Sequence, residues 1–414
     1  MLYVLCSLLV CYTEANGSLA SVGRLMQPAS LSILTPTPLY PAHAGAKTHS
    51  LNALRQLSQY YTVDSYCLTK QPEAVDWGPL AQWCRDLRAF VPSKPTWRNL
   101  DPPAVDLEFS QPMLDYLQQR WQQAAPNLLQ LEGTTMAQYA PFARRLGVNA
   151  TICTVHQVGF VAQWRRLQRE KSWPLRARRL AGLLSLWLYE QRALRHCDLL
   201  VTLSETDQQT LARWQPKLKI VTVPSGVDLA EWPLCRQQKA PQQVLFVGNY
   251  FHPPNVEGAL WLAREVWPLV QAQMPEARLM LAGRSPTPEI QQLASATIEV
   301  PGTVDDLRQV YRQSRVVAAP IFWGSGVRIK ILEGLAAGLP LVTTALAAEG
   351  LPLKHEEHAL FAERPADFAA ALVRILQTPA LGAQLGDAGR QLIADRYDWR
   401  AIGLQLQQHY QALL

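Results

Sequence analysis

Apolar runs alternate with segments of helical periodicity along the second half of the chain. The apolar runs lie at 244–250, 278–284, 298–302, 315–321 and 339–345, and the helical patterns between them lie at 255–271, 288–294, 304–313 and 328–337. Continuous apolar runs of this length are typical of strands buried on both faces, and parallel strands need a crossover helix between them. The pattern therefore predicts a parallel doubly wound sheet.

The first half of the chain shows the same alternation less regularly. Strands are predicted at 31–38, 61–68, 127–133, 150–156, 198–204 and 219–228, with a helix at 51–59. Residues 70–126 have weak periodicity, so we expect only short helices and loops there. The polar stretch 229–242 has no apolar period and is typical of a linker. The predicted parts are an N-terminal extension (1–30), an α/β domain (31–228), the linker, a second α/β domain (243–395) and a C-terminal helix (396–414).

The composition indicates a folded protein and limits its partners. Hydrophobic residues make up 48% of the 414 residues and charged residues 17%. The net charge of +6 is too small to indicate nucleic-acid binding. The seven cysteines are scattered and form no CxxC pair, which argues against a disulfide framework or zinc site and favours a reducing compartment. The apolar run at 1–12 lacks a preceding basic residue and is too short to span a bilayer, so we expect a cytoplasmic protein.

The most informative stretch is GSGVRIKILEGLAAGLP, at 324–340. A glycine-rich turn follows a predicted strand there and leads into a helix that should end at Gly338. A helix N-terminus favours anions, yet this helix begins with Arg328 and Lys330 and has its acid only at Glu333. Free amides and two basic side chains would bind phosphate oxygens, and Glu333 would accept hydrogen bonds from a ribose diol. The stretch predicts a nucleoside diphosphate site, unless Lys330 and Glu333 form only an exposed ion pair.

Both halves of the chain carry an ordered series of short motifs. The C-terminal series is VLFVGNYFHPPNVEGALWL, LMLAGRSP, VPGTVDDLRQVY, AAPIFWGSGVRIKILEGLAAGLPLVTT, AAEGL and RYDWRA. The N-terminal series is SILTPTPLYPAHAGAKTHSLNAL, LEGTTMAQYAP, TICTVHQVGF, YEQRALRHCDLLVTLSETD and VPSGVD. Over roughly residues 31–405 the chain resembles the family-four retaining glycosyltransferases of the GT-B fold, in their GxGxRxK branch. The resemblance implies an α/β protein of two Rossmann-like doubly wound domains that face each other across a cleft, with a C-terminal helix that crosses back to the N-terminal domain.

The resemblance also implies a function. It implies a retaining, metal-independent transfer of a sugar from a nucleotide-diphosphate sugar to a saccharide or lipid-linked acceptor, with no other cofactor and no metal site. The catalytic roles would fall on Arg328, Lys330, Glu333 and His156, whose imidazole would face the cleft and bind the donor sugar. Substrate contacts would fall on Gly45, Gly248, Asn249, Asn255, Arg284, Gly324, Ser325, Gly326 and Glu349. Without the resemblance, the simpler interpretation of His156, Gly45, Gly248, Arg284 and Glu349 is that they are packing, capping or solvated residues.

Two features depart from the usual family pattern. Ser325 stands eight residues before Glu333, where the usual motif has a second Glu, so a carboxylate expected near the donor sugar is missing. Asn249 and Asn255 stand where basic residues are usual. We expect Arg328 and the neighbouring lysine to meet the phosphate charge instead, with the two asparagines as neutral hydrogen-bond donors.

The segment 161–195 is strongly basic. It holds nine basic residues against Glu170 and Glu190, a net charge of +7. The segment predicts a basic amphipathic helix that starts at Pro174. Its apolar positions at helical spacing are Leu180, Leu183, Leu184, Trp187 and Leu188. This stripe faces either the protein core or an anionic lipid surface, which would suit a lipid-linked acceptor and place the protein at the inner face of a membrane.

Two other classes of function remain open from the sequence. A sugar-nucleotide epimerase would share the two-domain scaffold, but it would need paired acid and base carboxylates in the cleft, and the sequence identifies none. A non-catalytic nucleotide-sugar-binding protein should have lost Arg328, Lys330 or Glu333, and all three are present.

Overall fold

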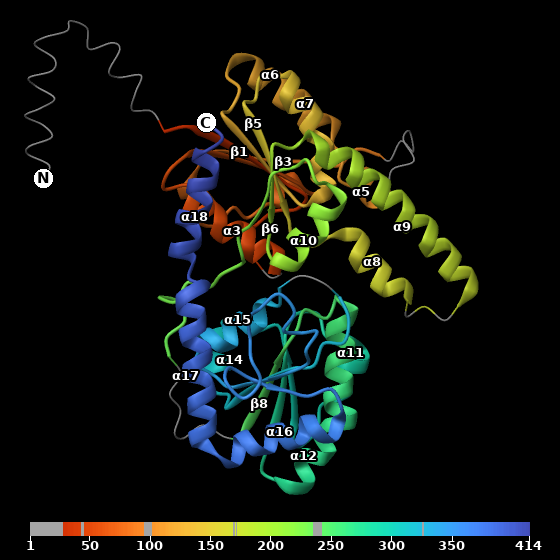
Figure 1. The fold of residues 1–414 in the computed structure, drawn as a ribbon, viewed down its shortest axis with the longest axis vertical. Helices are drawn as coiled ribbons and strands as arrows, with labels where there is room; N and C mark the ends of the chain where they lie inside the picture. Colours follow the sequence, from red (N-terminus) through yellow and green to blue (C-terminus); the bar gives the residue numbers. More distant parts are fainter. Residues whose placement is uncertain are drawn as a thin grey trace, which may run out of the picture.

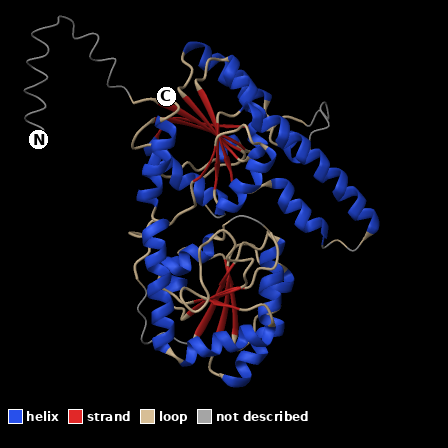
Figure 2. Ribbon diagram, in the orientation of Figure 1, coloured by secondary structure: helices blue, strands red, loops and turns tan. Residues whose placement is uncertain are grey.

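The computed structural model of the chain describes residues 28–42, 45–94, 102–168, 170, 172–234, 242–324 and 327–414. Within them, two α/β domains face each other, and each is built around one parallel sheet flanked by helices (Figures 1 and 2). The predicted fold class, two Rossmann-like doubly wound domains, is confirmed. Most of the predicted extension (1–27) and of the predicted linker (235–241) lies outside the described residues.

The N-terminal sheet has seven strands in the order β3-β2-β1-β4-β5-β6-β7. The strands are β1 (Ser30–Thr35), β2 (Thr62–Leu68), β3 (Cys84–Phe90), β4 (Leu128–Glu132), β5 (Ala150–Val155), β6 (Leu199–Thr202) and β7 (Ile220–Thr222). The helices are α3 (Gly45–Leu57), η2 (Pro72–Ala74), α4 (Leu80–Trp83), α5 (Pro103–Leu107), α6 (Gln111–Gln123), η3 (Thr134–Tyr139), α7 (Ala140–Arg145), α8 (Gly159–Gln168), α9 (Trp173–Ala193), η4 (Leu194–His196) and α10 (Glu205–Trp214). The strand order reverses between β1 and β4, the position at which doubly wound sheets bind ligands.

The C-terminal sheet has six strands in the order β10-β9-β8-β11-β12-β13. The strands are β8 (Gln243–Val247), β9 (Arg278–Ala282), β10 (Ile298–Gly302), β11 (Val316–Ala319), β12 (Leu341–Thr343) and β13 (Leu360–Phe361). The helices are α11 (Pro253–Trp261), the π-helical turn η5 (Leu262–Val266), α12 (Trp267–Gln273), α13 (Pro288–Gln291), α14 (Leu307–Arg312), α15 (Ile329–Ala336), α16 (Pro365–Gln377), α17 (Pro379–Arg396) and α18 (Trp399–Gln411). Here the order reverses between β8 and β11.

Two local predictions in the first half were wrong. The segment 70–126 contains a strand, β3, which pairs with β2 at the edge of the sheet. Arg85, Asp86 and Arg88 interrupt the apolar residues of β3, so this strand lacks a continuous apolar run. Arg85 of β3 donates two hydrogen bonds, of 2.9 and 2.6 Å, to the carboxylate of Asp64 in β2. The helix expected at 51–59 begins earlier, at Gly45, because its first turn is polar and lies at the cleft.

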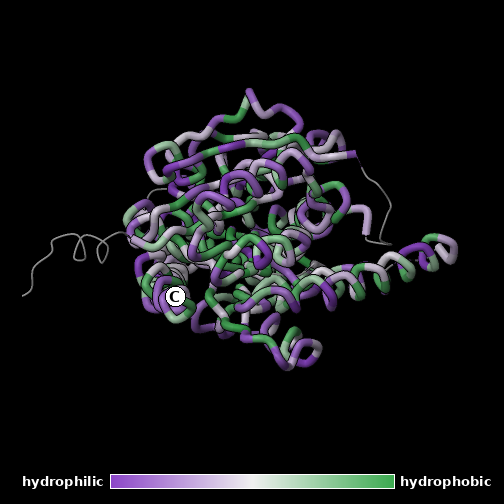
Figure 3. Tube along the Cα trace, turned by 90° about the horizontal axis from the view of Figure 1, so that it is seen from above, coloured by the Kyte–Doolittle hydropathy of each residue, from purple (hydrophilic) through white to green (hydrophobic). Residues whose placement is uncertain are grey.

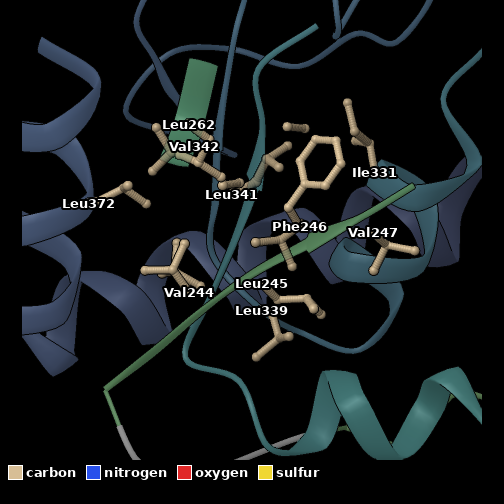
Figure 4. Packing of buried hydrophobic residues seen from close by; sticks show 14 of the residues in the cluster. Val244, Leu245, Phe246, Val247, Leu262, Ile331, Leu339, Leu341, Val342 and Leu372 are labelled. Carbon is tan, nitrogen blue, oxygen red and sulfur yellow. The ribbon is translucent and has the colours of Figure 1, made fainter. Parts of the chain in front are cut away.

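The core of the C-terminal domain surrounds β8. Val244, Leu245 and Phe246 of this strand are completely buried. Figure 4 shows them packed among side chains that include Ile331 of α15 and Leu372 of α16. Complete burial of a side chain of this size contributes about 1.5 to 3 kcal/mol. The end of β8 and the start of α15 are therefore held in fixed positions relative to each other.

The chain crosses between the domains at two points that lie together. The amide of Val227 donates to the carbonyl of Tyr397 (2.9 Å), and the amide of Trp399 donates to the carbonyl of Val227 (3.2 Å). After the second crossing, α18 packs against α3 of the N-terminal domain. Four side chains of α18 join the N-terminal core: Trp399, Ile402, Leu406 and Tyr410.

The basic segment forms two helices rather than one. Helices α8 and α9 pack as a hairpin that projects from the N-terminal domain (Figure 1). Pro174 lies in the first turn of α9, as predicted. The core-facing alternative is wrong for Leu180, Leu184 and Leu188, which are 54%, 57% and 53% exposed. Arg169 and Lys171 lie outside the described residues.

Candidate active site

A cleft between the domains brings most of the predicted site residues together. The N-terminal domain contributes Ala42, Gly45 and Thr48, and the C-terminal domain contributes the rest of the lining. The cleft lies at the carboxyl ends of β8, β9 and β10, where a doubly wound sheet binds its ligands. The predicted residues that line it are Gly45, Gly248, Asn249, Asn255, Arg284, Arg328, Lys330 and Glu333.

Helix α15 begins at the wall of this cleft. Arg328 has an extended backbone (φ −90°, ψ 97°), and the helix starts at the next residue. The first amides of a helix have no partner within it and carry a partial positive charge. No acidic side chain occupies the first turn of α15, so the helix itself does not neutralise that charge. The helix ends at Ala336, and Gly338 follows with a φ of +74°, as the sequence predicted.

Lys330 is held in the cleft by weak partners. Its Nζ donates to Oδ1 of Asn255 (2.8 Å) and lies 4.4 Å from the centre of the Phe246 ring. Burial, together with the charge of Arg328, lowers the pKa of Lys330 to about 7. Burial also lowers the pKa of Arg328 to about 10, although the carboxylates of Glu349 and Asp207 act in the opposite direction. Both cations are therefore poorly solvated, and an anion in the cleft would stabilise their charged forms.

Glu333 has a different partner from Lys330. The hydroxyl of Tyr311, on α14, lies 3.1 Å from Oε2 of Glu333 and 3.2 Å from the carbonyl of Lys330. Burial raises the pKa of Glu333 to about 7, and the Tyr311 hydrogen bond and the Lys330 charge only partly oppose this. No ion pair joins Lys330 to Glu333 within the described residues, which disfavours the interpretation of the two as an exposed pair.

The loops that follow β8 and β9, beside Lys330, leave no room for a side chain at Gly248 or Gly283. A Cβ on Gly248 would lie 2.9 Å from the Phe246 ring, and a Cβ on Gly283 would lie 1.7 Å from the carbonyl oxygen of Gly248. Gly283 also has a φ of +143°. The two loops that follow β8 and β9 can therefore approach each other, and both line the cleft.

The two asparagines of the VGNYFHPPN loop have different hydrogen-bond partners. Asn255 donates through Nδ2 to the carbonyl of Asn249 (2.8 Å) and accepts from Lys330 through Oδ1. Asn255 therefore positions Lys330 through Oδ1 and uses one of its two Nδ2 hydrogens within the loop. Asn249 accepts from the amide of Phe251 through Oδ1 (3.2 Å).

Gly45 brings the two domains close at the cleft. It is the first residue of α3, and a Cβ at this position would lie 3.1 Å from Cγ1 of Ile329, the first residue of α15. The two helices therefore begin next to each other on opposite sides of the cleft. Gly45 is both a helix-entry residue and a point of close approach between the domains.

His156 does not line the cleft with Lys330 and Glu333. It follows β5, and its Nε2 lies 2.7 Å from Oε2 of Glu132, the last residue of β4. Ser50 of α3 donates to the same carboxylate oxygen (2.6 Å). Burial favours the protonated acid, but the hydrogen bonds from His156 and Ser50 and the nearby imidazoles lower the pKa of Glu132 to about 2. Nδ1 of His156 is buried and finds no hydrogen-bond partner among the described residues.

Glu349 and Gly324 lie beside the cleft rather than in its lining. Both contact Arg165 of α8, in the opposite domain. Arg165 donates to the two carboxylate oxygens of Glu349 (2.7 Å each) and to the carbonyl of Gly324 (2.7 Å). Ser325 and Gly326 lie outside the described residues. In the described part of the chain, no three His, Cys, Asp or Glu side chains are arranged to hold a metal ion.

Two family models match the chain, one on each domain. The model described as Glycosyltransferase Family 4 matches residues 44–231, and the model described as Glycosyl transferases group 1 matches residues 241–378. The chain belongs to this family of glycosyltransferases. The two matched ranges contain the residues on both sides of the cleft.

Curated relatives and solved structures are consistent with membership of this glycosyltransferase family. The chain is 28% identical over 215 residues to the phosphatidyl-myo-inositol mannosyltransferase of Mycobacterium leprae (strain TN), over 49% of this chain and 56% of that protein. The chain spans about half the length of the curated relatives it matches. The sucrose-phosphate synthase of Thermosynechococcus elongatus shares the fold, with a TM-score of 0.71 at 19% identity over 93% of this chain and 99% of that chain. HepE of Anabaena, in complex with UDP and glucose, has a TM-score of 0.63 at 13% identity over 92% and 99% of the two chains.

Several residues that shape the cleft were not predicted. Phe246 and Tyr311 belong to apolar patterns in the sequence and contact the cleft residues only through tertiary packing. Arg165 is one of many arginines in its segment. Of these residues, only Glu132 could have been identified from the sequence. A carboxylate at the end of a buried strand needs a partner to offset its desolvation.

Proposed function

We propose that the protein transfers a sugar from a nucleotide-diphosphate donor to a saccharide or lipid-linked acceptor. The observation that carries this proposal is the position of Arg328, Lys330 and the start of α15 on one wall of an interdomain cleft. Two poorly solvated cations and the positive end of a helix dipole form a site for a diphosphate. Glu333, one turn further along α15, is placed to accept hydrogen bonds from the ribose.

The reaction needs stabilisation of the leaving group more than it needs a catalytic base. When the bond between the anomeric carbon and the phosphate oxygen breaks, its electron pair stays on the diphosphate, and negative charge grows there. Arg328 and Lys330 are fixed cations in a site of low solvation, which makes their stabilisation of that charge strong. The acceptor hydroxyl forms the new bond to the anomeric carbon, and its proton passes to the leaving diphosphate.

We further propose that the transfer retains the anomeric configuration and needs no metal ion. Retention follows if the diphosphate takes the acceptor's proton on the face that it leaves, which dispenses with a second catalytic carboxylate of the glycosidase type. Among the described residues that line the cleft, Glu333 is the one acid. Metal independence is supported by the two basic side chains, which meet the phosphate charge from within the chain.

The relatives support the choice of substrates. The structural neighbour HepE is in complex with UDP and glucose, and the curated relative of Mycobacterium leprae is a phosphatidyl-myo-inositol mannosyltransferase. These names support a nucleotide sugar as donor and a lipid-linked acceptor. The missing carboxylate at Ser325 leaves the donor sugar itself to be identified by experiment.

A thermal-shift panel of nucleoside diphosphates and nucleotide sugars tests the proposal. A ligand present at about 100 times its Kd should raise the stability by roughly 2.7 kcal/mol, with and without EDTA. The nucleotide sugar that binds is then incubated with acceptors, and the anomeric configuration of the product is determined by NMR. Stabilisation that EDTA abolishes would contradict metal independence. Conversion of the donor sugar to its epimer without any acceptor would contradict transfer.

A further inference from the structure

The hairpin of α8 and α9 presents an apolar face to solvent. Along α9 this apolar stripe consists of Trp173, Ala177, Leu180, Leu184 and Leu188, which are all exposed, with Trp173 at 78%. A spacing of three or four residues places them on one side of the helix, over a length of about 22 Å. Figure 3 shows the hairpin projecting from the body of the molecule. No other described element covers this stripe, since α9 turns Tyr189, Glu190 and Ala193 to the core.

The charges that border the apolar stripe are positive. On the helix surface, Arg176 lies on one side of the stripe and Arg192 on the other, because successive residues are about 100° apart. Both are exposed, as is Arg178. Arg179 is paired with Glu170 (2.8 Å), so the acid of the hairpin tip is already neutralised. An apolar face bordered by arginines matches a surface with an apolar interior and anionic headgroups.

We infer that the α8–α9 hairpin binds an anionic lipid surface, with the apolar stripe of α9 lying in the interface plane. A second copy of the chain fits this face less well, because pairing two hairpins would bring arginines against arginines. Insertion across a bilayer is not the expected mode. Within the described residues, no helix has both the length and the apolar character to cross a membrane.

The hairpin is joined to the donor side of the cleft. Arg165, on α8, binds Glu349 and the carbonyl of Gly324, the first residue of the glycine-rich turn. A lipid surface bound by the hairpin would therefore lie at a fixed position relative to the cleft. Given the proposed function, on which this step rests, the acceptor is an amphiphile whose head group reaches the cleft from that surface.

Sedimentation with vesicles tests the inference on the full chain. We expect binding to vesicles of phosphatidylglycerol and phosphatidylcholine, and none to phosphatidylcholine alone. The double substitution Arg176→Gln and Arg178→Gln should weaken binding roughly thirtyfold, since each charge near such a surface contributes about a factor of five. The matched control is Arg396→Gln with Arg400→Gln, which removes two exposed arginines far from the hairpin and should leave binding unchanged. A third variant, Leu180→Gln with Leu184→Gln, should abolish the part of the binding that survives high salt.

The outcomes separate this inference from the proposed function. Diphosphate binding is measured for each variant without vesicles and should equal that of the unmodified protein. If no variant differs from the unmodified protein on vesicles, or if the control loses as much as the hairpin variant, the inference is overturned while the proposed function stands. It is also overturned if the unmodified protein is a dimer in solution that Leu180→Gln with Leu184→Gln converts to a monomer. If the unmodified protein does not bind a diphosphate, that result would instead contradict the proposed function.

Discussion

Arg165 and Glu349 lie in different domains and are joined by two parallel hydrogen bonds of 2.7 Å each. A bidentate pair of arginine and carboxylate is stronger and more directional than most surface ion pairs. This pair is about three-quarters shielded from solvent on both sides, with side-chain exposures of 26% and 28%. Because Arg165 also binds Gly324, it connects the N-terminal domain to the loop that carries the proposed diphosphate site.

The first prediction is that Arg165→Gln slows sugar transfer. The substitution removes the connection between α8 and the donor loop, so the domains should spend less time in the arrangement that aligns donor and acceptor. We expect the turnover number to fall by about ten- to a hundredfold, because a misplacement of about 1 Å can cost that much. Diphosphate affinity should change little, since Arg165 does not line the cleft.

Arg166→Gln is the control for this prediction. Arg166 is the next residue on α8 and is exposed, so its substitution removes the same charge from the same helix. Turnover and affinity should both match the unmodified protein. Equal losses of turnover in the two variants would indicate a general effect of charge on the hairpin and would contradict a specific role for Arg165.

Much of the fold could be predicted because it follows from local pattern. The strands β8, β11 and β12 of the C-terminal sheet are fully buried and therefore appear as continuous apolar runs, and α15 carries its stop signal at Gly338. β3 could not be recognised this way, since Arg85, Asp86 and Arg88 interrupt its apolar residues. The environment of the exposed α9 stripe could not be predicted. Helical periodicity shows that one face of a helix is apolar, but it does not show whether that face contacts the protein core or another surface.

The site was predictable where its residues are close in sequence. Lys330 and Glu333 lie one turn apart on α15 and Arg328 directly precedes the helix, so their spacing alone places them near one another. Their partners lie far away in the chain, such as Tyr311 and Asn255, and only the folded structure brings these to the cleft. The strongly shifted pKa values are equally unpredictable, because they depend on burial.

A second prediction concerns the buried pair of His156 and Glu132. His156→Ala should lower the turnover number about tenfold or more, while the affinity for free diphosphate stays within about twofold, because the imidazole comes from the domain opposite the phosphate site. Glu132→Gln should show the same separation, since it removes the charge that orients the imidazole. Steady-state kinetics and calorimetric titration measure the two quantities. Equal losses in turnover and in diphosphate affinity would place His156 at the phosphate site instead.

The acid dependence of stability provides a check on Glu132→Gln. The pKa of Glu132 is about 2 in the folded protein, below its usual value of about 4.3 in an unfolded chain. The ionised Glu132 carboxylate therefore stabilises the fold above about pH 4, and this contribution is lost as the pH falls toward 2. We expect urea unfolding of the unmodified protein to lose more stability across that window than unfolding of the variant. Parallel loss in both proteins would contradict a buried, ionised Glu132 carboxylate.

A third prediction concerns the pH dependence of the free and bound states. Between pH of about 7 and about 10, the unfolded state binds a proton at Lys330 that the ligand-free folded state does not, so this residue makes stability rise with pH. A bound diphosphate favours the ammonium and raises the pKa of Lys330, so affinity should fall as the pH rises above about 7 and binding should take up a proton. Titration in two buffers of different ionisation enthalpy measures that uptake.

Two variants identify the residue that takes up the proton when diphosphate binds. The pKa of Glu333 is also raised to about 7, and an anion in the cleft would raise it further, so Glu333 is a second source of proton uptake. Lys330→Met should remove most of the uptake, and Glu333→Gln should leave most of it in place. The reverse result would assign the proton to Glu333 and contradict a neutral Lys330 in the ligand-free protein.

The last prediction distinguishes the roles of Arg328, Lys330 and Glu333 by the chemistry of the ligand. Hydrogen bonds to charged groups contribute about 1.5 to 3 kcal/mol, so Arg328→Ala or Lys330→Ala should weaken diphosphate binding by roughly ten- to a hundredfold. Affinity for the nucleoside without phosphates should hardly change. Glu333→Ala should weaken binding of the nucleoside and of the diphosphate by the same factor, because the proposed partners of Glu333 are ribose hydroxyls. Calorimetric titration of the three variants with both ligands measures all six affinities.

The same titrations exclude a purely structural role for the three side chains. If Lys330 and Glu333 served only to stabilise α15, their substitution would change unfolding free energies by a few tenths of a kcal/mol and leave every affinity unchanged. Asn255→Ala is an informative companion, because Asn255 accepts from Lys330 through Oδ1 and so positions its ammonium. Asn255→Ala should weaken diphosphate binding less than Lys330→Ala does. In a protein that already carries Lys330→Ala, it should have no further effect on diphosphate binding. Unchanged diphosphate affinity in both Arg328→Ala and Lys330→Ala would end the claim that this helix binds phosphate.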